Sequence, residues 1–379
     1  MQAKAAPYPQ TRRPWFAMRP VNAIMDGVMA VTSYSEPLLT WYARAARDLP
    51  WRTVSAGPWS VLVSEFMLQQ TPVNRVLPAH ARWLIRWPSP PVLAAEPAGE
   101  AIREWGRLGY PRRALRLHET ARIITARHDG TVPSTIEELR ALPGVGSYTA
   151  AAIASFAFGQ RHAVLDTNVR RVLARLIGGS AGPSSTSVSV AETRLAESLL
   201  PDVPPVAARW SVAVMELGAL VCTAATPRCT ECPLAEQCAW LAAGRPGPAA
   251  GPRAGTGPGT AAGPGARAGS GTAAGSGARR QRYEGTDRQC RGRILAVLRE
   301  CSHAVPRVDF DPVWPDQAQL DRALAGLVAD GLATHSPHGY TLPGTHPWAH
   351  VEPGPVTLYA ALSPFPAGHT GTKATDTHQ

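Results

Sequence analysis

Four cysteines at the end of an apolar segment constrain the fold of this chain more than any other feature. Cys222, Cys229, Cys232 and Cys238 lie within seventeen residues, and one pair has C-x2-C spacing. No secretory signal is visible, so we expect a cytosolic protein, in which disulfides are rare. A tetrahedral zinc ion and an iron–sulfur cluster both take four such thiolates. The apolar segment 210–221 predicts a buried helix that leads into this centre.

A Pro-Gly turn between two helical segments is the second informative feature. Gly144 and Gly146 flank Val145, and a new helix is expected to begin at Ser147. Glycines let the backbone approach a ligand closely, and successive N–H groups at a helix start bind anions. The anion could be a DNA phosphate, held without recognition of the base sequence. The alternative is an ordinary helix–turn–helix corner with no ligand.

The charge distribution permits nucleic-acid binding without requiring it. The chain carries a formal net charge of +10, with 21 Arg and 17 acidic residues over 35–241, and 7 basic and 10 acidic residues from 283 onwards. Lys4 and Lys373 are the only lysines, so the predicted folded core contains no lysine that could form a Schiff base. No apolar run is long enough to cross a membrane.

Composition shifts divide the chain into five segments. We expect a flexible arm over 1–33, a helical domain over 34–241 and a disordered Gly/Pro/Ala-rich linker over 242–282. A second folded unit over 283–343 and a disordered tail over 344–379 complete the chain.

The unit from 283 to 343 has the pattern of a winged-helix-like module. We expect helices over 288–301 and 316–330, an extended segment over 305–310, and a hairpin that turns at 336–339. Winged helices often bind DNA, but this module is acidic overall. Packing or protein contact is therefore the alternative role.

Glu65 is the only acidic residue in a helical segment that ends before Pro72. It stands among Val61, Leu62, Phe66 and other apolar residues. A carboxyl group desolvated in this way has a raised pKa and can act as a general acid near neutral pH. The alternative is a surface position on the polar face of the helix.

The Gly-flanked loop 106–113 combines one aromatic ring with three arginines. Its arginines, among them Arg112 and Arg113, could hold phosphates while Tyr110 wedges between bases. The alternative is a core tyrosine with solvated arginines around it.

Asp166 follows the apolar run 163–165 and opens a helix. The commonest role of an aspartate at this position is the helix N-cap. The helix dipole and backbone N–H groups keep such a carboxylate ionised, which suits stabilisation of a positively charged sugar. The two roles are compatible.

Taken together, residues 36–241 resemble the helix–hairpin–helix DNA glycosylases, and most closely the MutY-type adenine glycosylases. Glutamate within Met-Leu-Gln-Gln-Thr separates this branch from its relative endonuclease III. The matching segments are Leu49-Pro50-Trp51-Arg52, Ser64-Glu65-Phe66-Met67-Leu68-Gln69-Gln70-Thr71, Leu108-Gly109-Tyr110, Leu142-Pro143-Gly144-Val145-Gly146, 165–175, 216–222 and the cysteine spacing.

The resemblance implies an all-α, two-lobed fold, with DNA across the cleft and adenine flipped out of the duplex. Glu65 corresponds to the catalytic acid that protonates adenine and then handles the attacking water. Asp166 corresponds to the carboxylate that stabilises, or transiently bonds to, the oxocarbenium-like sugar. Tyr148 and Asn168 would support these carboxylates, and Tyr110 would intercalate beside the lesion.

The resemblance also implies the binding residues and the cofactor. Gln69, Gln70 and the hairpin residues Gly144, Val145 and Gly146 would contact DNA. The base pocket would include Trp51, Arg52 and Met215. The cysteine spacing is that of the family's 4Fe–4S cluster, with Cys222, Cys229, Cys232 and Cys238 as ligands.

Three departures from the family pattern concern substrate recognition. Val212 stands where the family commonly has Gln or Glu against the adenine, and Pro111 replaces a second tyrosine. The family's usual C-terminal Nudix-like domain, which helps to recognise 8-oxoguanine, is not recognisable in this sequence. The linker and the winged-helix-like module stand in its place.

We therefore expect a monomeric, monofunctional adenine glycosylase that acts on double-stranded DNA at adenine opposite 8-oxoguanine or guanine. It would work in the cytoplasm, in association with the nucleoid. One alternative is an endonuclease III-like glycosylase/lyase for damaged pyrimidines, which the lack of a core lysine disfavours. The other is a non-catalytic iron–sulfur DNA-binding protein, which the presence of both Glu65 and Asp166 disfavours.

Overall fold

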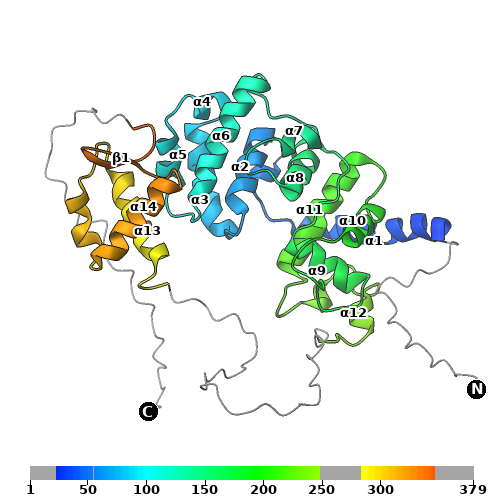
Figure 1. Cartoon of the computed structure of the whole chain (residues 1–379). Coiled ribbons are helices and arrows are strands. Elements are labelled where there is room, and N and C mark those ends of the chain that lie inside the picture. Colours follow the sequence, from blue (N-terminus) through cyan, green and yellow to red (C-terminus); the bar gives the residue numbers. More distant parts are fainter. Residues whose placement is uncertain (1–22, 54, 248–282, 346–379) are drawn as a thin grey trace, which may run out of the picture. The chain divides into compact units, whose positions relative to one another are not determined.

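The fold is almost entirely helical, with one two-stranded sheet among the described residues (Figure 1). The structure is a computed structural model that describes residues 23–53, 55–247 and 283–345, with side chains from residue 33 onwards. These residues form two compact units. The first comprises the described residues up to 61, 134–141 and 145–247, and the second comprises 62–133, 142–144 and 283–345. No described helix is long and apolar enough to cross a bilayer.

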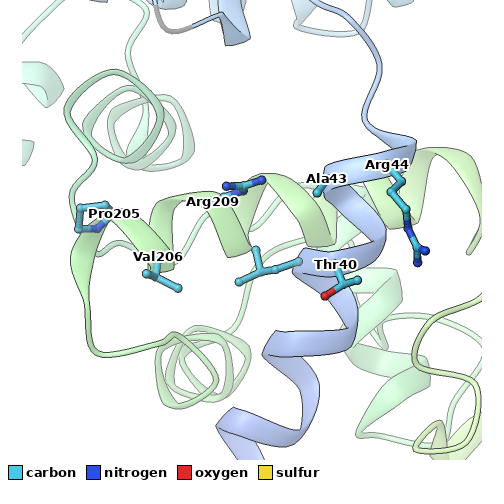
Figure 2. A pocket seen from close by; sticks show the side chains of 7 residues that line it. Thr40, Ala43, Arg44, Pro205, Val206 and Arg209 are labelled. Carbon is cyan, nitrogen blue, oxygen red and sulfur yellow. The ribbon is translucent and has the colours of Figure 1, made fainter.

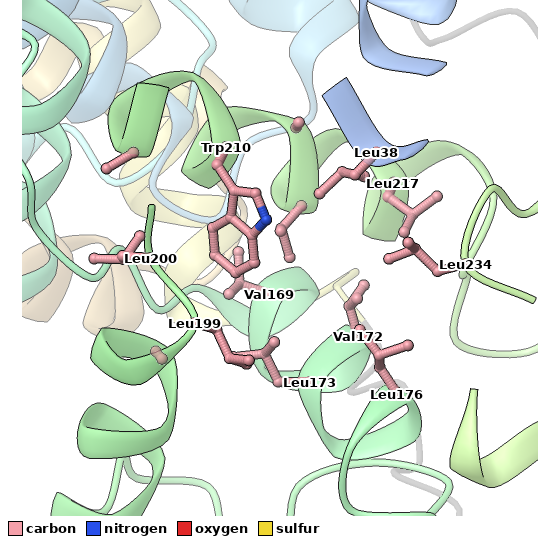
Figure 3. Close-up of a cluster of buried hydrophobic side chains, with 14 of the residues drawn as sticks. Leu38, Val169, Val172, Leu173, Leu176, Leu199, Leu200, Trp210, Leu217 and Leu234 are labelled. Carbon is pink, nitrogen blue, oxygen red and sulfur yellow. The ribbon is translucent and has the colours of Figure 1, made fainter. Parts of the chain in front are cut away.

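The first unit is built around α11 and α9. Trp210 of α11 and Val169 and Leu173 of α9 belong to one buried cluster, which also receives Leu38 from α1 (Figure 3). The elements of this unit are α1 (Ala23–Ala45), η1 (Pro50–Arg52), α7 (Ile136–Arg140), α8 (Ser147–Phe158), α9 (Thr167–Leu176), α10 (Val190–Ser198), α11 (Pro204–Leu220), η2 (Cys229–Glu231) and α12 (Ala239–Ala242).

Three tryptophans that meet edge-on lie at the centre of the helices of the second unit. Trp83 lies edge-on to Trp87 and Trp105, with ring centroids 4.6 and 5.7 Å away, and all three rings are buried. The helix α2 (Pro58–Leu68) begins in the first unit and continues into the second. The other elements are α3 (Val73–Arg86), α4 (Pro90–Ala94), α5 (Ala98–Trp105), α6 (Arg112–Arg127), α13 (Asp287–Glu300), η3 (Arg307–Val313), α14 (Gln317–Ala329), β1 (Thr334–Ser336) and β2 (Gly339–Thr341).

The residues from 283 contain the predicted helices and hairpin. The prediction of an extended segment over 305–310 is wrong. Only Val305 forms a β-bridge, to Tyr340, and the chain then enters the 3-10 helix η3. Pro306 is the N-cap of η3 and lacks an N–H, so it cannot continue a strand ladder. Phe310 is buried edge-on to Tyr340 instead.

Two helices begin earlier than the sequence predicts. The helix α1 begins at Ala23, inside the predicted flexible arm, and α11 begins at Pro204 rather than at 210. The apolar run up to Val31 is compatible with a helix, and prolines are tolerated in a first helical turn. Residues 1–22, most of the predicted linker and all but the start of the predicted tail lie outside the described residues.

Candidate functional site

Glu65 is a buried carboxylic acid on α2. Its exposed fraction is 6%, and Leu62, Phe66 and Met67 around it on the same helix are fully buried. The helix is apolar on nearly every side, which explains why its single acidic residue is carried into the interior. The alternative of a surface glutamate is therefore wrong. The side chain is shielded from bulk water.

The end of α2 is held by a buried arginine, Arg113, which was predicted to hold a phosphate. Arg113 is 5% exposed, so it cannot hold a phosphate as predicted. Burial lowers the pKa of its guanidinium to about 10. The side chain provides hydrogen-bond donors for the carbonyl groups that are left unpaired at the C-terminus of the helix. It donates hydrogen bonds to the carbonyl oxygens of Phe66, Met67, Gln69 and Gly109 and to the Thr71 hydroxyl.

The same arginine joins the two loops that were predicted to contact DNA. The Gln69 carbonyl oxygen accepts a hydrogen bond from Arg113. The next residue, Gln70, is exposed and has a φ of 54°. The ring of Tyr110 lies 5.3 Å from the Arg113 guanidinium and is 48% exposed, with a φ of 49°. The alternative of a core tyrosine is wrong. Left-handed backbone is uncommon at non-glycine residues, and where it occurs it is concentrated at functional sites.

The two glycines of the hairpin have different structural roles. Gly144 has a φ of 83°, and a Cβ there would lie 3.0 Å from Phe66 and 3.1 Å from Arg116. Gly146 has an ordinary φ of −86°, and no described residue has an atom within 4 Å of its hypothetical Cβ. Val145 between them is 7% exposed. Gly144 is therefore required by the fold, whereas Gly146 leaves space at the start of α8.

This difference gives a matched pair of substitutions. We expect Gly144→Ala to destabilise the protein by about 1–3 kcal/mol, because alanine must adopt left-handed backbone and displace its neighbours. Gly146→Ala should change stability by less than about 0.5 kcal/mol. It should still weaken DNA binding, because the new methyl group occupies the space where a phosphate would approach. Thermal melting and DNA titrations of both variants check these expectations, and equal melting points would contradict them.

Asp166 is the N-cap of α9, as predicted. Its Oδ1 accepts a hydrogen bond from the Val169 N–H at 2.6 Å, and its Oδ2 accepts one from the Asn168 amide at 2.8 Å. Burial raises the pKa of Asp166 above its usual value, and these hydrogen bonds oppose the rise without cancelling it. The capping interactions alone therefore do not set its charge state. Asp166 is a half-buried carboxyl group held in one orientation from two sides.

A hydrogen-bonded chain leads from Asp166 to the cysteine segment. Asn168 accepts from Arg171 at 2.9 Å, and Arg171 donates to the carbonyl oxygens of Gly218 and Cys222 at 2.7 and 2.8 Å. A Cβ at Gly218 would lie 2.7 Å from the Asn168 Cβ, so this glycine permits close packing of α11 on α9. The orientation of Asp166 is thus linked to the conformation of residue 222.

The predicted base-pocket residues are less available than expected. Trp51 is 6% exposed, and the half-buried Met215 packs against the apolar core. Arg52 forms an ion pair with Glu216 at 2.8 Å. Tyr148 is half-buried in the first turn of α8.

Glu216 is a buried acidic residue whose role was not predicted. Burial favours its neutral form, but hydrogen bonds from Arg47 and the positive charge of Arg52 outweigh that effect and lower its pKa to about 2. Both hydrogen bonds from the Arg47 guanidinium to its carboxylate are 2.7 Å long, and the Arg47 backbone N–H donates a third at 3.0 Å. Its position in the buried segment 210–221 was the available signal, because a buried acid requires a cationic partner. Glu216 joins α11 to residues 47 and 52.

The four clustered cysteines are half-buried and line one cavity together with Arg175 and Trp240. Arg175 donates to the Cys222 sulfur at 3.4 Å and to the carbonyl oxygens of Thr223 and Ala224, and it lies 4.5 Å from the Trp240 ring. Burial, together with the other three cysteines, raises the pKa of Cys232 to about 11. Among the described residues, no group of three or more ligand side chains has the arrangement of a single-ion site.

An open groove elsewhere in the first unit lies between α1 and α11 (Figure 2). Arg44 and Arg209 are on its border, and Val206 contributes apolar surface. The predicted catalytic residues are not among those that line it, so we do not assign it a role in catalysis.

The predicted site residues are divided between the two units. The second unit contains Glu65, Gln69, Gln70, Tyr110 and Gly144. The first unit contains Trp51, Arg52, Val145, Gly146, Tyr148, Asp166, Asn168, Met215 and the four clustered cysteines.

Comparison with known proteins identifies the family. The HhH-GPD superfamily of base excision DNA repair proteins matches residues 63–195, which include Glu65, the hairpin and Asp166. Adenine DNA glycosylase of Mycobacterium tuberculosis is 48% identical over 309 residues, which cover 81% of this chain and 92% of that protein. The chain belongs to the adenine DNA glycosylase family. This membership confirms the predicted helix–hairpin–helix glycosylase class.

Other members of the family and one solved structure are also similar to this chain. Adenine DNA glycosylase of Mycolicibacterium smegmatis is 46% identical over 80% of this chain and 93% of that protein. The human adenine DNA glycosylase is 43% identical over 56% of this chain and 40% of its own length. A thermostable thymine-DNA glycosylase structure has a TM-score of 0.51 and 26% identity, and the match covers 57% of this chain and 98% of that one. The helical core is therefore shared with glycosylases of different base preference.

Proposed function

We propose that this protein is a monofunctional adenine DNA glycosylase that hydrolyses the bond between adenine and deoxyribose where adenine is opposite 8-oxoguanine or guanine. The observation that carries this proposal is the buried carboxylic acid Glu65, in a chain that belongs to the adenine glycosylases. Its substrate is double-stranded DNA, and we expect it to act as a monomer on DNA of the nucleoid.

Glu65 supplies the proton that makes adenine a leaving group. Its carboxyl group, shielded from water, donates a proton to a ring nitrogen of the flipped adenine. The bond from the base to C1′ of the sugar then breaks, and its electrons go to the base. The Glu65 carboxylate next accepts a proton from the water that adds to C1′. The products are adenine and an intact abasic sugar.

Asp166 stabilises the positive charge that develops on the sugar. A carboxylate opposite an oxocarbenium-like centre contributes most when its orientation is fixed before the reaction. The hydrogen bonds from Val169 and Asn168 provide that fixed orientation. Tyr148 supports the same site from α8.

The DNA is held by backbone groups of the hairpin and by two exposed loops. The N–H groups at Val145 and Gly146 bind a phosphate where Gly146 leaves space. Tyr110 inserts into the base stack, for which its half-exposed ring is suited. Gln69 and Gln70 contact the strand beside it.

The clustered cysteines hold a 4Fe–4S cluster in this proposal. Cys222, Cys229, Cys232 and Cys238 fit this group because four thiols border one cavity and Arg175 lies against it to offset their negative charge. When bound, the cluster has a structural role and fixes the conformation of residues 222–238.

We expect the purified protein to be brown and to contain about four irons per chain. Cys229→Ser should lower the iron content and DNA affinity together, because the segment loses a ligand. Cys301→Ser is the matched control: this buried cysteine lies outside the cluster, and the variant should retain its iron. Stoichiometric zinc without iron, in protein prepared anaerobically, would contradict the cluster assignment.

Product analysis tests the monofunctional mechanism. A lyase needs an amine that forms a Schiff base with the opened sugar, and no lysine occurs between Lys4 and Lys373. Arginine cannot replace it because its guanidinium stays protonated. The DNA strand should therefore break only after alkali treatment, and borohydride should trap little covalent complex. Efficient trapping would favour the glycosylase/lyase alternative.

A further inference from the structure

The C-terminal residues 283–345, called here the C-terminal module, are docked on α5 within the second unit. The Gly99 N–H donates to the Pro343 carbonyl at 2.7 Å. Arg103 donates to the Cys301 carbonyl at 3.1 Å, and Arg299 of the module donates to the Ile102 carbonyl at the same distance. These contacts run in both directions between the module and α5, so they fix the module beside this helix.

Close packing and a further ion pair strengthen this docking. A Cβ at Gly99 would lie 2.8 Å from both the Leu342 Cβ and the Pro343 carbonyl oxygen, so there is no room for a side chain. Arg112, at the start of α6, pairs with Asp330 of the module at 3.4 Å. The module is therefore held next to the loop that carries Tyr110.

The first turn of α13 places an arginine over Tyr110. The Arg288 guanidinium lies 5.4 Å from the centroid of the Tyr110 ring and 6.0 Å from that of Tyr283. The two rings are 48% and 52% exposed, and Arg288 is itself exposed. Two rings and a cation are thus gathered at the surface around the residue proposed to enter the base stack.

Arg288 is the arginine of α13 that forms neither an ion pair nor a hydrogen bond with the described residues. Arg293 and Arg299 of the same helix donate to the carbonyl oxygens of Val313 and Ile102. Arg291 pairs with Asp330, and Arg307 pairs with Asp311 and Asp321. Among the described residues, Arg288 forms no ion pair. The guanidinium instead makes cation–π contacts with the two rings. Its charge is therefore free to bind an anion.

We propose that Arg288 and Tyr283 of the C-terminal module contact the DNA backbone beside the nucleotide step that Tyr110 enters. When the Tyr110 ring moves into the base stack, the Arg288 guanidinium is left beside a phosphate, which it binds better than a ring. Exposed Arg107, in the same loop as Tyr110, adds a second positive charge. This inference rests on the proposed function, since it takes Tyr110 to be the intercalating residue.

DNA fits this surface better than a protein partner does. The chain from 283 onwards has 7 basic and 10 acidic residues, so it does not attract nucleic acid through its overall charge. Arg288, the arginine of α13 with neither an ion pair nor a hydrogen bond among the described residues, nevertheless lies at Tyr110 rather than elsewhere on the module. Local placement of the charge, rather than net charge, therefore points to a phosphate.

The test compares Arg288→Ala with Arg322→Ala in the full-length protein. Both remove one exposed arginine of the module, and Arg322 lies on α14. The probe is a duplex with an uncleavable fluorinated adenosine opposite guanine. Its binding is measured by fluorescence anisotropy over a series of salt concentrations. Arg288→Ala should weaken binding about tenfold. It should also reduce the slope of log affinity against log salt by about 0.9, the effect of one lost phosphate contact.

The controls separate this inference from the proposed function. Arg322→Ala should bind like the wild type, and Arg288→Lys should recover the salt slope but only part of the affinity, because lysine keeps the charge without the planar fork. Tyr283→Ala should weaken binding without changing the slope. Wild-type affinity and slope in Arg288→Ala, or equal losses in Arg288→Ala and Arg322→Ala, would overturn the inference. Neither result affects adenine release by the wild-type enzyme, whose absence would instead refute the proposed function.

Discussion

Glu65→Gln should slow adenine release at least ~10²-fold under single-turnover conditions, because it removes the general acid and leaves the shape of the side chain unchanged. The expected loss is large since Glu65 is 6% exposed, and bulk water has little access to replace it as the proton donor. Glutamine keeps the volume of the side chain in a helix whose neighbouring residues are fully buried. DNA binding and the melting temperature should therefore stay close to those of the wild type.

Glu119→Gln is the matched control for this substitution. Glu119 forms an exposed i,i+3 ion pair with Arg122 on α6, so its neutralisation should change neither rate nor stability measurably. Normal catalysis by Glu65→Gln, with DNA binding retained, would favour the non-catalytic DNA-binding alternative. A Glu65→Gln variant that lost its fold would be compared with Glu65→Asp, which keeps the acid and should keep part of the rate.

Asp166→Asn should slow the same step roughly 10²- to 10³-fold, because it removes the negative charge that faces the developing positive sugar. The structure separates this loss from helix capping. Asparagine is about as good an N-cap as aspartate, and its side-chain oxygen can still accept from the Val169 N–H. We therefore expect the stability to fall by less than about 1 kcal/mol.

The capping contribution has its own control. Asp316 caps α14 in the same way, accepting from the Gln319 N–H at 2.9 Å, so Asp316→Asn measures the cost of this change at another helix. If Asp166→Asn and Asp316→Asn lower the melting temperature equally and only the first loses activity, the charge of Asp166 is required for the reaction. Full activity in Asp166→Asn would remove Asp166 from the mechanism.

Much of the fold follows from local sequence signals. Asp166 before an amphipathic segment specifies the start of α9, and the Pro-Gly pair at 143–144 specifies the hairpin, because each feature depends on residues close in sequence. Glu65 is buried for the same reason, since its whole helix is apolar. The cysteine spacing likewise brings four thiols to one cavity.

Features that depend on distant contacts did not follow from the sequence. Arg113 stands next to Arg112 in an apparently solvated loop, yet it is buried because the carbonyls at the end of α2, more than forty positions away, require a donor. Glu216 and Arg47 are 169 positions apart, and the ion pair with Arg47 helps to keep the buried Glu216 charged. The rise in the pKa of Asp166 depends on tertiary burial, which a capping motif does not reveal.

The central claim is tested most directly by single-turnover release of adenine from duplexes that carry adenine opposite 8-oxoguanine, guanine or thymine. We predict release from the first two duplexes and little from the third, with the abasic strand intact until alkali is added. Release of adenine at equal rates opposite thymine, or release of a damaged pyrimidine with strand cleavage but no release of adenine, would contradict this account.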